Sequence, residues 1–326
     1  MMAHINNITE RYIFFDEPSH KYTDECGNVY TSVTTAIHKF IVPFKRNYWA
    51  KIKAAESNTS EHVIKKQWDN INKHSIDKGN KKHGDLEHAI KSTSKFSKAV
   101  NIININNITR CFSVYDLLSN SDIGEMSLEE FYNKIGYKYK IIFDTIKYYV
   151  DQGFRIYSEI NVYDPINLIS GTIDVLLVKG SKFVIIDWKT NRNDISFEAG
   201  YYKKDKETNE LTDIWVPSKK YMLYPMDHLE DCTGIHYSLQ LSMYANLVEL
   251  FGYTNMVMIL FHIRDSYALN KYGMPRKDER GLYIIDKEKP ENVNYHIIPY
   301  LRNEVETLRN YVGRDNTVLT QRVILM

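Results

Sequence analysis

The chain has few cysteines and no cysteine pair with metal-binding spacing. Its 326 residues include only Cys26, Cys111 and Cys232, and no two of them form a Cys-x-x-Cys motif. This scarcity argues against a disulfide scaffold, a zinc finger and an iron–sulfur cluster. The scattered thiols fit a reducing compartment.

The sequence also lacks a charged-then-apolar leader and any apolar run of roughly 18 residues. We therefore expect a cytoplasmic protein that is neither secreted nor membrane-spanning. Isoleucine, asparagine, lysine and tyrosine are abundant, which is typical of an AT-rich genome. This composition suggests a viral or phage source, and hence the host cytoplasm.

No excess of charge of either sign is present, since 42 Lys and Arg face 41 Asp and Glu, for a net charge of +1. Long-range attraction to nucleic acid is then weak, and any DNA-binding surface must be local. One basic stretch interleaves Phe44, Tyr48 and Trp49 with cations, and another surrounds residue 83. Either these residues contact phosphates and stack on the bases of a single strand, or they form a solvated helix face whose aromatics belong to the core.

The most informative segment is a predicted hairpin over residues 171–190. Two β-branched or aliphatic runs flank Gly180-Ser181, which has glycine first, as a type II′ turn requires. This turn sets Lys179 opposite Lys182, and by the same register Asp174 falls opposite Asp187. Lys189 lies two residues beyond Asp187 and therefore points to the same face.

Two carboxylates directly opposite each other destabilise a sheet unless a cation compensates them. Lys189 supplies one positive charge, and a divalent ion would supply the rest. Oxygen ligands with open positions suit Mg²⁺ or Mn²⁺ better than Zn²⁺. The alternative is a structural Asp187/Lys189 ion pair with an unrelated Asp174.

Other candidate residues lie in three predicted elements. His83 and Glu87 share a face of a helix predicted over residues 81–91, and the pair is either functional or an ordinary surface pair. Alternation over residues 154–162 predicts a strand with Glu159 on a polar face, as a functional or a merely solvated carboxylate. Gln240 and Tyr244 lie four residues apart in an apolar stripe of a helix predicted over 236–251.

In order along the chain, these blocks resemble the RecB-like exonuclease branch of the PD-(D/E)XK nuclease superfamily, which includes the mitochondrial genome maintenance exonuclease and many phage-encoded nucleases. The resemblance covers roughly residues 30–265. Its blocks are Gly79-Asn80-Lys81-Lys82-His83 with Glu87, Glu159, Gly171-Thr172-Ile173-Asp174, Asp187-Trp188-Lys189-Thr190, and Gln240-Leu241-Ser242-Met243-Tyr244. The Pro-Asp dipeptide that names the superfamily is missing, because Thr172-Ile173 precede Asp174.

The resemblance implies an α/β fold of restriction-endonuclease-like type, with a central mixed β-sheet flanked by helices and carrying insertions. It also implies a Mg²⁺- or Mn²⁺-dependent DNA nuclease using one or two ions, and an exonuclease rather than an endonuclease. The implied substrate is DNA that is single-stranded or has free ends. The implied metal ligands are His83, Asp174, Asp187 and the Trp188 backbone carbonyl; the implied catalytic residues are Lys189, Asp187, Asp174 and Glu159; the implied substrate contacts are Gln240, Tyr244, Glu87, Lys81 and Lys82.

We expect one nuclease domain over residues 1–326. Its parts are an N-terminal hairpin and helical segment at 1–78, insertions at 92–126 and 191–235, and a C-terminal helix and tail at 299–326. The 92–126 insertion is predicted to be mobile or a short hairpin, and the 191–235 insertion a loop or hairpin overhanging the site. The sequence further predicts a strand at 282–286 and a helix over 299–312 that Gly313 closes.

Two other functions stay open. A nucleic-acid-binding or assembly protein could keep this fold without turnover, although mutually repelling carboxylates have no purpose in a retired site. A structure- or sequence-specific endonuclease of restriction type is the other alternative, with a base-reading module hidden in an insertion.

Overall fold

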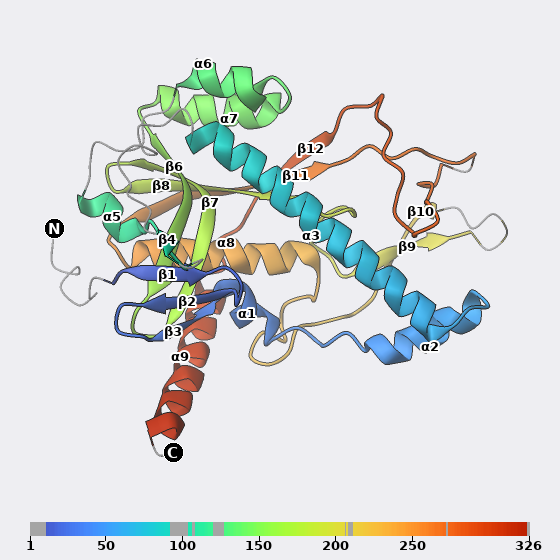
Figure 1. Ribbon diagram of the computed structural model, residues 1–326, viewed down its shortest axis with the longest axis horizontal. Helices are drawn as coiled ribbons and strands as arrows, with labels where there is room; N and C mark the ends of the chain where they lie inside the picture. The colour runs from blue at the N-terminus through green and yellow to red at the C-terminus, as the bar shows by residue number, and fades with distance from the viewer. Residues whose placement is uncertain are drawn as a thin grey trace.

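The computed structural model describes residues 11–91, 104–105, 108–119, 127–205, 207, 211–271 and 273–324. A large mixed β-sheet runs through the molecule, with helices on both of its faces (Figure 1). The α/β class and the mixed central sheet predicted above are therefore confirmed. Among the described residues, none of the helices combines the length and the apolar character needed to cross a membrane.

The strands are β1 (Ile13–Asp16), β2 (Lys21–Asp24), β3 (Val29–Ser32), β4 (Asn104–Ile105), β5 (Ile108–Arg110), β6 (Arg155–Asp164), β7 (Ile169–Lys179), β8 (Lys182–Lys189), β9 (Gly200–Lys204), β10 (Leu211–Pro217), β11 (Thr254–Arg264) and β12 (Asn292–Ile297). Their order in the main sheet is β12-β11-β8-β7-β3-β2-β1-β5-β4, with β6 on the other edge of β7, while β9 and β10 form a separate hairpin. β8 and β11 are parallel, whereas β7 is antiparallel to both of its neighbours β6 and β8.

The helical segments are α1 (Val33–His38), α2 (Arg46–Glu56), α3 (Glu61–Lys91), α5 (Val114–Ser119), α6 (Leu128–Phe131), the π-helical turn η2 (Tyr132–Gly136), α7 (Lys140–Asp151), α8 (Thr233–Glu249) and α9 (Arg302–Ile324). The π-helical turn η2 ends at Gly136, and the chain becomes helical again at Lys140. The opening hairpin and the helix after it are confirmed, since the Ser32 hydroxyl accepts a hydrogen bond from the Thr35 backbone N–H and so caps α1.

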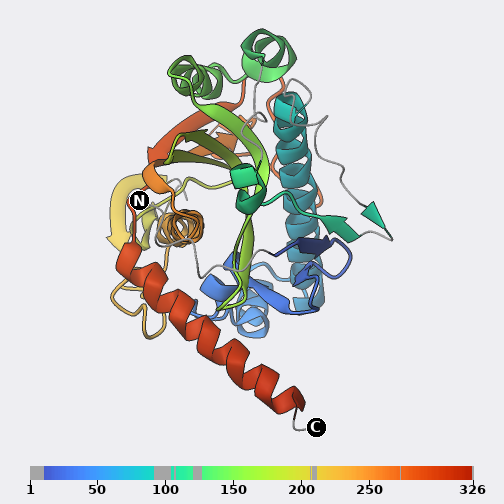
Figure 2. The same ribbon diagram turned by 90° about the vertical axis from the view of Figure 1, so that its left-hand side faces the viewer.

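Two hydrophobic cores lie on opposite faces of the sheet. The α8-side core contains side chains of α1, α8 and α9, and the α3-side core contains side chains of α3, α6 and α7. Figure 2 shows α3 and α8 on opposite sides of β7. Along β8, Phe183 and Ile185 enter the α8-side core, and Val184, Ile186 and Trp188 enter the α3-side core. A strand buried on both faces explains the continuous apolar run in this part of the sequence.

The predicted hairpin and its register are confirmed. Gly180 has a φ of +58°, as the first position of a type II′ turn requires. Lys179 pairs with Lys182, and the ladder continues to Val175 opposite Ile186. The predicted pairing of Asp174 with Asp187 would be the next step in this register, but the ladder ends one residue before it.

The edge of β7 that faces β8 is shared between two strands. Its first residues, Ile169 and Ser170, pair with β3, and its last five, from Val175, pair with β8. Residues 171–174 lie between these ladders and have no partner strand on this edge. The edge of the sheet therefore opens where Asp174 is located.

Strand β6 does not keep the alternation predicted for residues 154–162. Ile156 enters the α3-side core, but Ile160, of the same parity, enters the α8-side core together with Tyr157. The cause is Glu159, whose φ of +55° lies in the left-handed region. The pairing register with β7 is the same before and after it, so the strand changes faces without an inserted residue. The expected polar face is wrong, because residues on both faces are buried.

Helix α3 is one continuous helix of 31 residues, rather than a helix over 81–91, so the boundary expected after residue 78 falls within it. Gly79 and Gly84 weaken the helical pattern without breaking it, since an interior glycine costs only about 1 kcal/mol. Gly79 also permits a close approach to β8, because a β-carbon there would lie 3.3 Å from the Thr190 hydroxyl oxygen.

Three further expectations change. Residues 282–286 form isolated bridges rather than a strand. Helix α9 begins at Arg302 and continues through Gly313, where glycine serves a close approach to Asn167 instead of a helix end. Helix α8 is buried on nearly all sides, not along one stripe.

The predicted insertions are described in part. In the region 92–126, the described residues include the β4–β5 hairpin, which joins the sheet through β1, and α5. The remainder of that region lies outside the described residues. The 191–235 insertion contains the β9–β10 hairpin. Of the two predicted forms, a loop or a hairpin, the hairpin is therefore present.

Candidate metal-binding and active site

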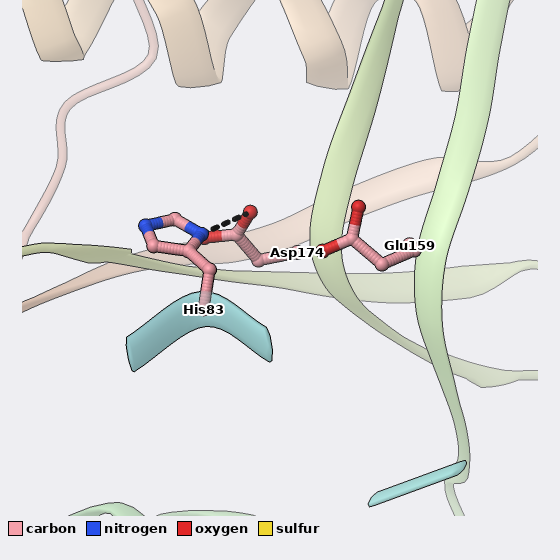
Figure 3. A group of neighbouring side chains, drawn as sticks. All are labelled: His83, Glu159 and Asp174. Atoms are coloured by element: carbon pink, nitrogen blue, oxygen red, sulfur yellow. Dashed lines mark ion pairs between the residues drawn. The ribbon is translucent and has the colours of Figure 1, made fainter. Parts of the chain in front are cut away.

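Three potential metal ligands from three elements converge at the open edge of β7. They are His83 of α3, Glu159 of β6 and Asp174 of β7, and one ligand atom of each lies within 4.8 Å of the others. Nδ1 of His83 is 3.5 Å from Oδ1 of Asp174. Figure 3 shows the Asp174 carboxylate directed toward the His83 imidazole, with the Glu159 carboxylate on the other side of Asp174. One nitrogen and two carboxylates can hold a divalent metal ion.

The local backbone explains how these side chains meet. Glu159 and Asp174 stand at equivalent points of the β6 and β7 ladders, where the left-handed conformation of Glu159 interrupts regular pairing. Asp174 is fixed further because its Oδ2 accepts a hydrogen bond of 2.9 Å from the Trp188 backbone N–H. This contact takes the place of a ladder bond between β7 and β8. The Trp188 backbone thus contacts the site through its N–H, and a role of its carbonyl as a metal ligand stays a prediction.

Asp187 and Lys189 form an ion pair beside this cluster, with 2.6 Å between Oδ2 and Nζ. Asp187 is only 1% exposed. Burial raises the pKa of Asp187 to about 6, against the lowering effect of Lys189. Burial alone would lower the pKa of Lys189, but the carboxylates of Asp187 and Asp174 outweigh it and hold that pKa above its usual value. Lys189 is therefore a protonated ammonium group at neutral pH.

The other two carboxyl groups respond in opposite directions. Burial, assisted by the charges of Asp174 and Glu87, raises the pKa of Glu159 to about 8. Burial also acts to raise the pKa of Asp174, but the neighbouring His83 and Lys189 and the Trp188 N–H lower it below the usual value. Asp174 is therefore firmly ionised, whereas the raised pKa values of Asp187 and Glu159 favour their protonated forms. A bound cation would favour the ionised form of both.

Tyr237 belongs to the site although the sequence analysis did not single it out. Nζ of Lys189 lies 5.1 Å from the centre of the Tyr237 ring, and the Tyr237 hydroxyl donates to Oδ1 of Asn191 at 3.0 Å. Both contacts restrain the end of β8. Tyr237 precedes Gln240 by three residues, so its position one turn earlier on the same helix was the available signal.

Gln240 and Tyr244 lie together on α8, as predicted, and Nε2 of Gln240 donates to the Tyr244 hydroxyl at 2.8 Å. Gln240 lines a hollow together with Thr34, His236 and Tyr237. The Tyr244 ring fits against Gly171, where a β-carbon would approach Cε1 to 2.6 Å. The glycine of the Gly171-Thr172-Ile173-Asp174 block therefore makes room for this tyrosine.

The predicted substrate contacts on α3 have different surroundings. Lys81 is exposed, whereas Lys82 forms ion pairs with Asp265, at 3.7 Å, and with Glu291. The charge of Lys82 is therefore balanced within the protein, and burial lowers its pKa to about 8. Glu87 is paired with Lys91 one turn later.

The aromatic residues of the first basic stretch are exposed rather than part of the core. Phe44, Tyr48 and Trp49 are 65%, 59% and 42% exposed. They lie at the start of α2, and the Phe44 ring meets Trp68 of α3 edge-on at 5.6 Å. A core role for these rings, one of the two alternatives considered, is therefore wrong.

Comparison of the chain with models of protein families, with curated proteins and with solved structures finds no match in any of the three. The arrangement of residues in the site is accordingly the basis on which function is inferred.

Proposed function

We propose that this protein is a divalent-metal-dependent nuclease that hydrolyses phosphodiester bonds in DNA, on a core of restriction-endonuclease-like type. The convergence of His83, Glu159 and Asp174 to within 4.8 Å, beside the Asp187–Lys189 pair, is the observation that carries the proposal. A preference for DNA ends, and so exonuclease action, follows from the resemblance to RecB-like exonucleases.

The residues present fit a metal ion. Two carboxylates and an imidazole offer ligand atoms at close range. The negative charge of Glu159, Asp174 and Asp187 is met by Lys189 and a protonatable His83 and, at Glu159, by Lys91, which is itself paired with Glu87. Mg²⁺ or Mn²⁺ held there would supply Lewis-acid charge to the phosphate and activate water. Carboxylate ligands favour these hard ions, although the imidazole also admits Zn²⁺.

The protein's own groups would orient and stabilise the reacting phosphate. Lys189 is held in place by Asp187 and by the Tyr237 ring. Because it stays protonated, it can donate hydrogen bonds and offset negative charge, but it cannot accept a proton from water. Such preorganised charge is worth most in a buried site, where water does not screen it. The exposed aromatics and lysines at the start of α2 would supply contacts to the substrate strand at a distance from the chemistry.

The proposal is tested by incubating the protein with covalently closed circular DNA and with linear DNA. Each substrate is supplied with Mg²⁺, Mn²⁺, Zn²⁺ or EDTA, and Asp174→Asn is run in parallel. We expect linear DNA to be degraded with Mg²⁺ or Mn²⁺ only, and Asp174→Asn to be inactive. Asp144→Asn, in an exposed ion pair with Lys140 on α7, is the matched control and should be fully active.

Other results would lead to other conclusions. Cutting of circular DNA would replace the exonuclease with an endonuclease. DNA binding without cleavage under any metal condition would favour a nucleic-acid-binding protein that has no turnover.

A further inference from the structure

A cavity of about 430 Å³ adjoins the metal cluster on the side of the N-terminal hairpin. It lies within the size range of about 300 to 1,000 Å³ that small-molecule sites occupy. Its lining includes Phe15, His20, Tyr22, Arg110, Glu159 and Thr172. We call it the Tyr22 pocket. Glu159 belongs both to this pocket and to the metal cluster, so a molecule in the pocket reaches the reacting centre.

One wall of the Tyr22 pocket is a group of aromatic rings. The Phe15 ring lies 5.1 Å from the His20 ring and 4.8 Å from the Tyr22 ring, measured between centroids. These rings come from β1, β2 and the turn that joins them, far in sequence from Glu159. Flat aromatic surfaces of this kind accommodate a planar heterocycle by stacking.

The polar groups of the pocket are mostly neutral or already paired. The Tyr22 hydroxyl and the Thr172 hydroxyl are 3.1 Å apart, and burial raises the pKa of Tyr22 to about 12. Arg110 is paired with Asp116 at 2.7 Å, and Lys91, also in the lining, is paired with Glu87. The described lining therefore suits an uncharged ring with hydrogen-bonding edges better than a phosphate group.

Resting on the nuclease function proposed above, we infer that the Tyr22 pocket holds one of the two nucleosides joined by the bond that is cleaved, with its base stacked on Phe15 and His20. The phosphate attached to that nucleoside then lies at Glu159 and the metal cluster. By binding the base that adjoins the reacting phosphate, the pocket positions the substrate strand. Any base can stack there because every base has a flat face.

The test uses single-stranded oligonucleotides in which one position at a time is made abasic. We expect one position next to the cleaved bond to be sensitive, with cleavage slowed about 5- to 140-fold, which corresponds to the loss of one stacked base. Phe15→Leu, which keeps apolar bulk, should slow cleavage of the intact strand by a similar factor. It should also remove the sensitivity to the abasic position, since the two changes delete the same contact.

Two further variants separate stacking from folding. His20 has a φ of +54°, so His20→Asn removes the ring with a residue that tolerates this conformation. It should behave like Phe15→Leu. Tyr295→Leu removes an exposed ring from β12, at the opposite edge of the sheet, and should match the wild type. Thermal unfolding of each variant verifies that it is folded.

A binding measurement keeps this inference separate from the nuclease function. The fluorescent base 2-aminopurine is placed at each position in turn, and its stacking is followed by quenching in EDTA, where no metal-dependent cleavage occurs. Quenching at one position in the wild type, lost in Phe15→Leu, supports the pocket even if no DNA is ever cleaved. Cleavage that is equally sensitive to abasic positions in wild type and Phe15→Leu overturns the pocket and leaves the nuclease intact. Absence of position-dependent quenching in the wild type also overturns it.

Discussion

At the scale of single residues, the site depends on charges that are held close together away from water. Lys189 is fixed by Asp187 at 2.6 Å, and Asp174 is fixed by the Trp188 N–H. The sequence predicted Asp174, Asp187 and Lys189 as a set because alternation along a strand determines which residues share a face. It could not predict the left-handed conformation of Glu159, because glutamate has no intrinsic preference for that region.

Replacing Lys189 with alanine should lower the rate of DNA cleavage by about 100-fold or more, because a preorganised charge at the reacting phosphate is lost. DNA affinity should change little, since most contacts to the strand lie elsewhere. The measurement is single-turnover cleavage together with equilibrium binding. Lys182→Ala is the matched control, since this exposed lysine lies at the other end of the same strand. Normal cleavage by Lys189→Ala would remove this residue from the mechanism.

Glu159 predicts a pH dependence of stability in the metal-free protein. Its pKa rises from 4.5 to about 8 on folding, so the folded state holds the proton more tightly than the unfolded chain does. The stabilising contribution is complete below pH 4.5 and is lost as the pH rises through 8. Glu159→Gln should therefore raise the free energy of unfolding at pH 8 by about 1 to 3 kcal/mol and change it little at pH 4.5. Urea unfolding in EDTA at both pH values measures the difference, and equal effects at the two would contradict it.

At the scale of elements, the sequence predicted those features that depend on neighbouring residues alone. The Gly180 turn specifies a two-residue hairpin, and the β7–β8 register followed from it. The start of α3 was placed at residue 81 rather than 61, and the end of α9 was misplaced because Gly313 was taken as a helix terminator. Gly79 and Gly313 instead allow close contact with residues distant in sequence, and a single sequence carries no signal of such tertiary contacts.

Two glycine-to-alanine substitutions should change the free energy of unfolding in opposite directions. Gly84 lies in α3, and a β-carbon there would meet nothing within 4 Å. Gly84→Ala should therefore raise the free energy of unfolding by about 1 kcal/mol, the difference in helix propensity. Gly171→Ala should lower it by about 1 to 3 kcal/mol, because the new methyl group would collide with Tyr244, 2.6 Å away, and with Val33, 3.1 Å away. Chemical denaturation of both variants gives the two values, and stabilisation by Gly171→Ala would refute the packing described here.

At the scale of the whole molecule, the α/β class and the mixed sheet were predicted from the resemblance to a nuclease family. The two-sided burial of β6 and α8 was not predicted, because alternating or striped patterns describe elements with one solvent face. The net charge of +1 also limits nucleic-acid attraction to local surfaces, such as the start of α2, and predicts a modest dependence of DNA affinity on salt.

A metal that binds only the folded protein should stabilise the whole molecule. With Mn²⁺ at 100 times its dissociation constant, the free energy of unfolding should rise by about 2.7 kcal/mol, and the melting temperature should rise with it. Asp174→Asn should lose most of this gain, whereas Asp144→Asn should keep it. Thermal scans with and without Mn²⁺ measure the effect, and an equal gain in Asp174→Asn would place the ion elsewhere.

The change of faces at Glu159 has a consequence for how the protein can vary. Strand β6 contributes to both cores before this residue and only to the α8-side core after it, so the carboxylate emerges where the strand leaves the α3-side core. Apolar substitutions can repack the core on either side of the sheet without changing Glu159 itself. The two hydrophobic cores can therefore change in sequence while the residues of the candidate site stay the same.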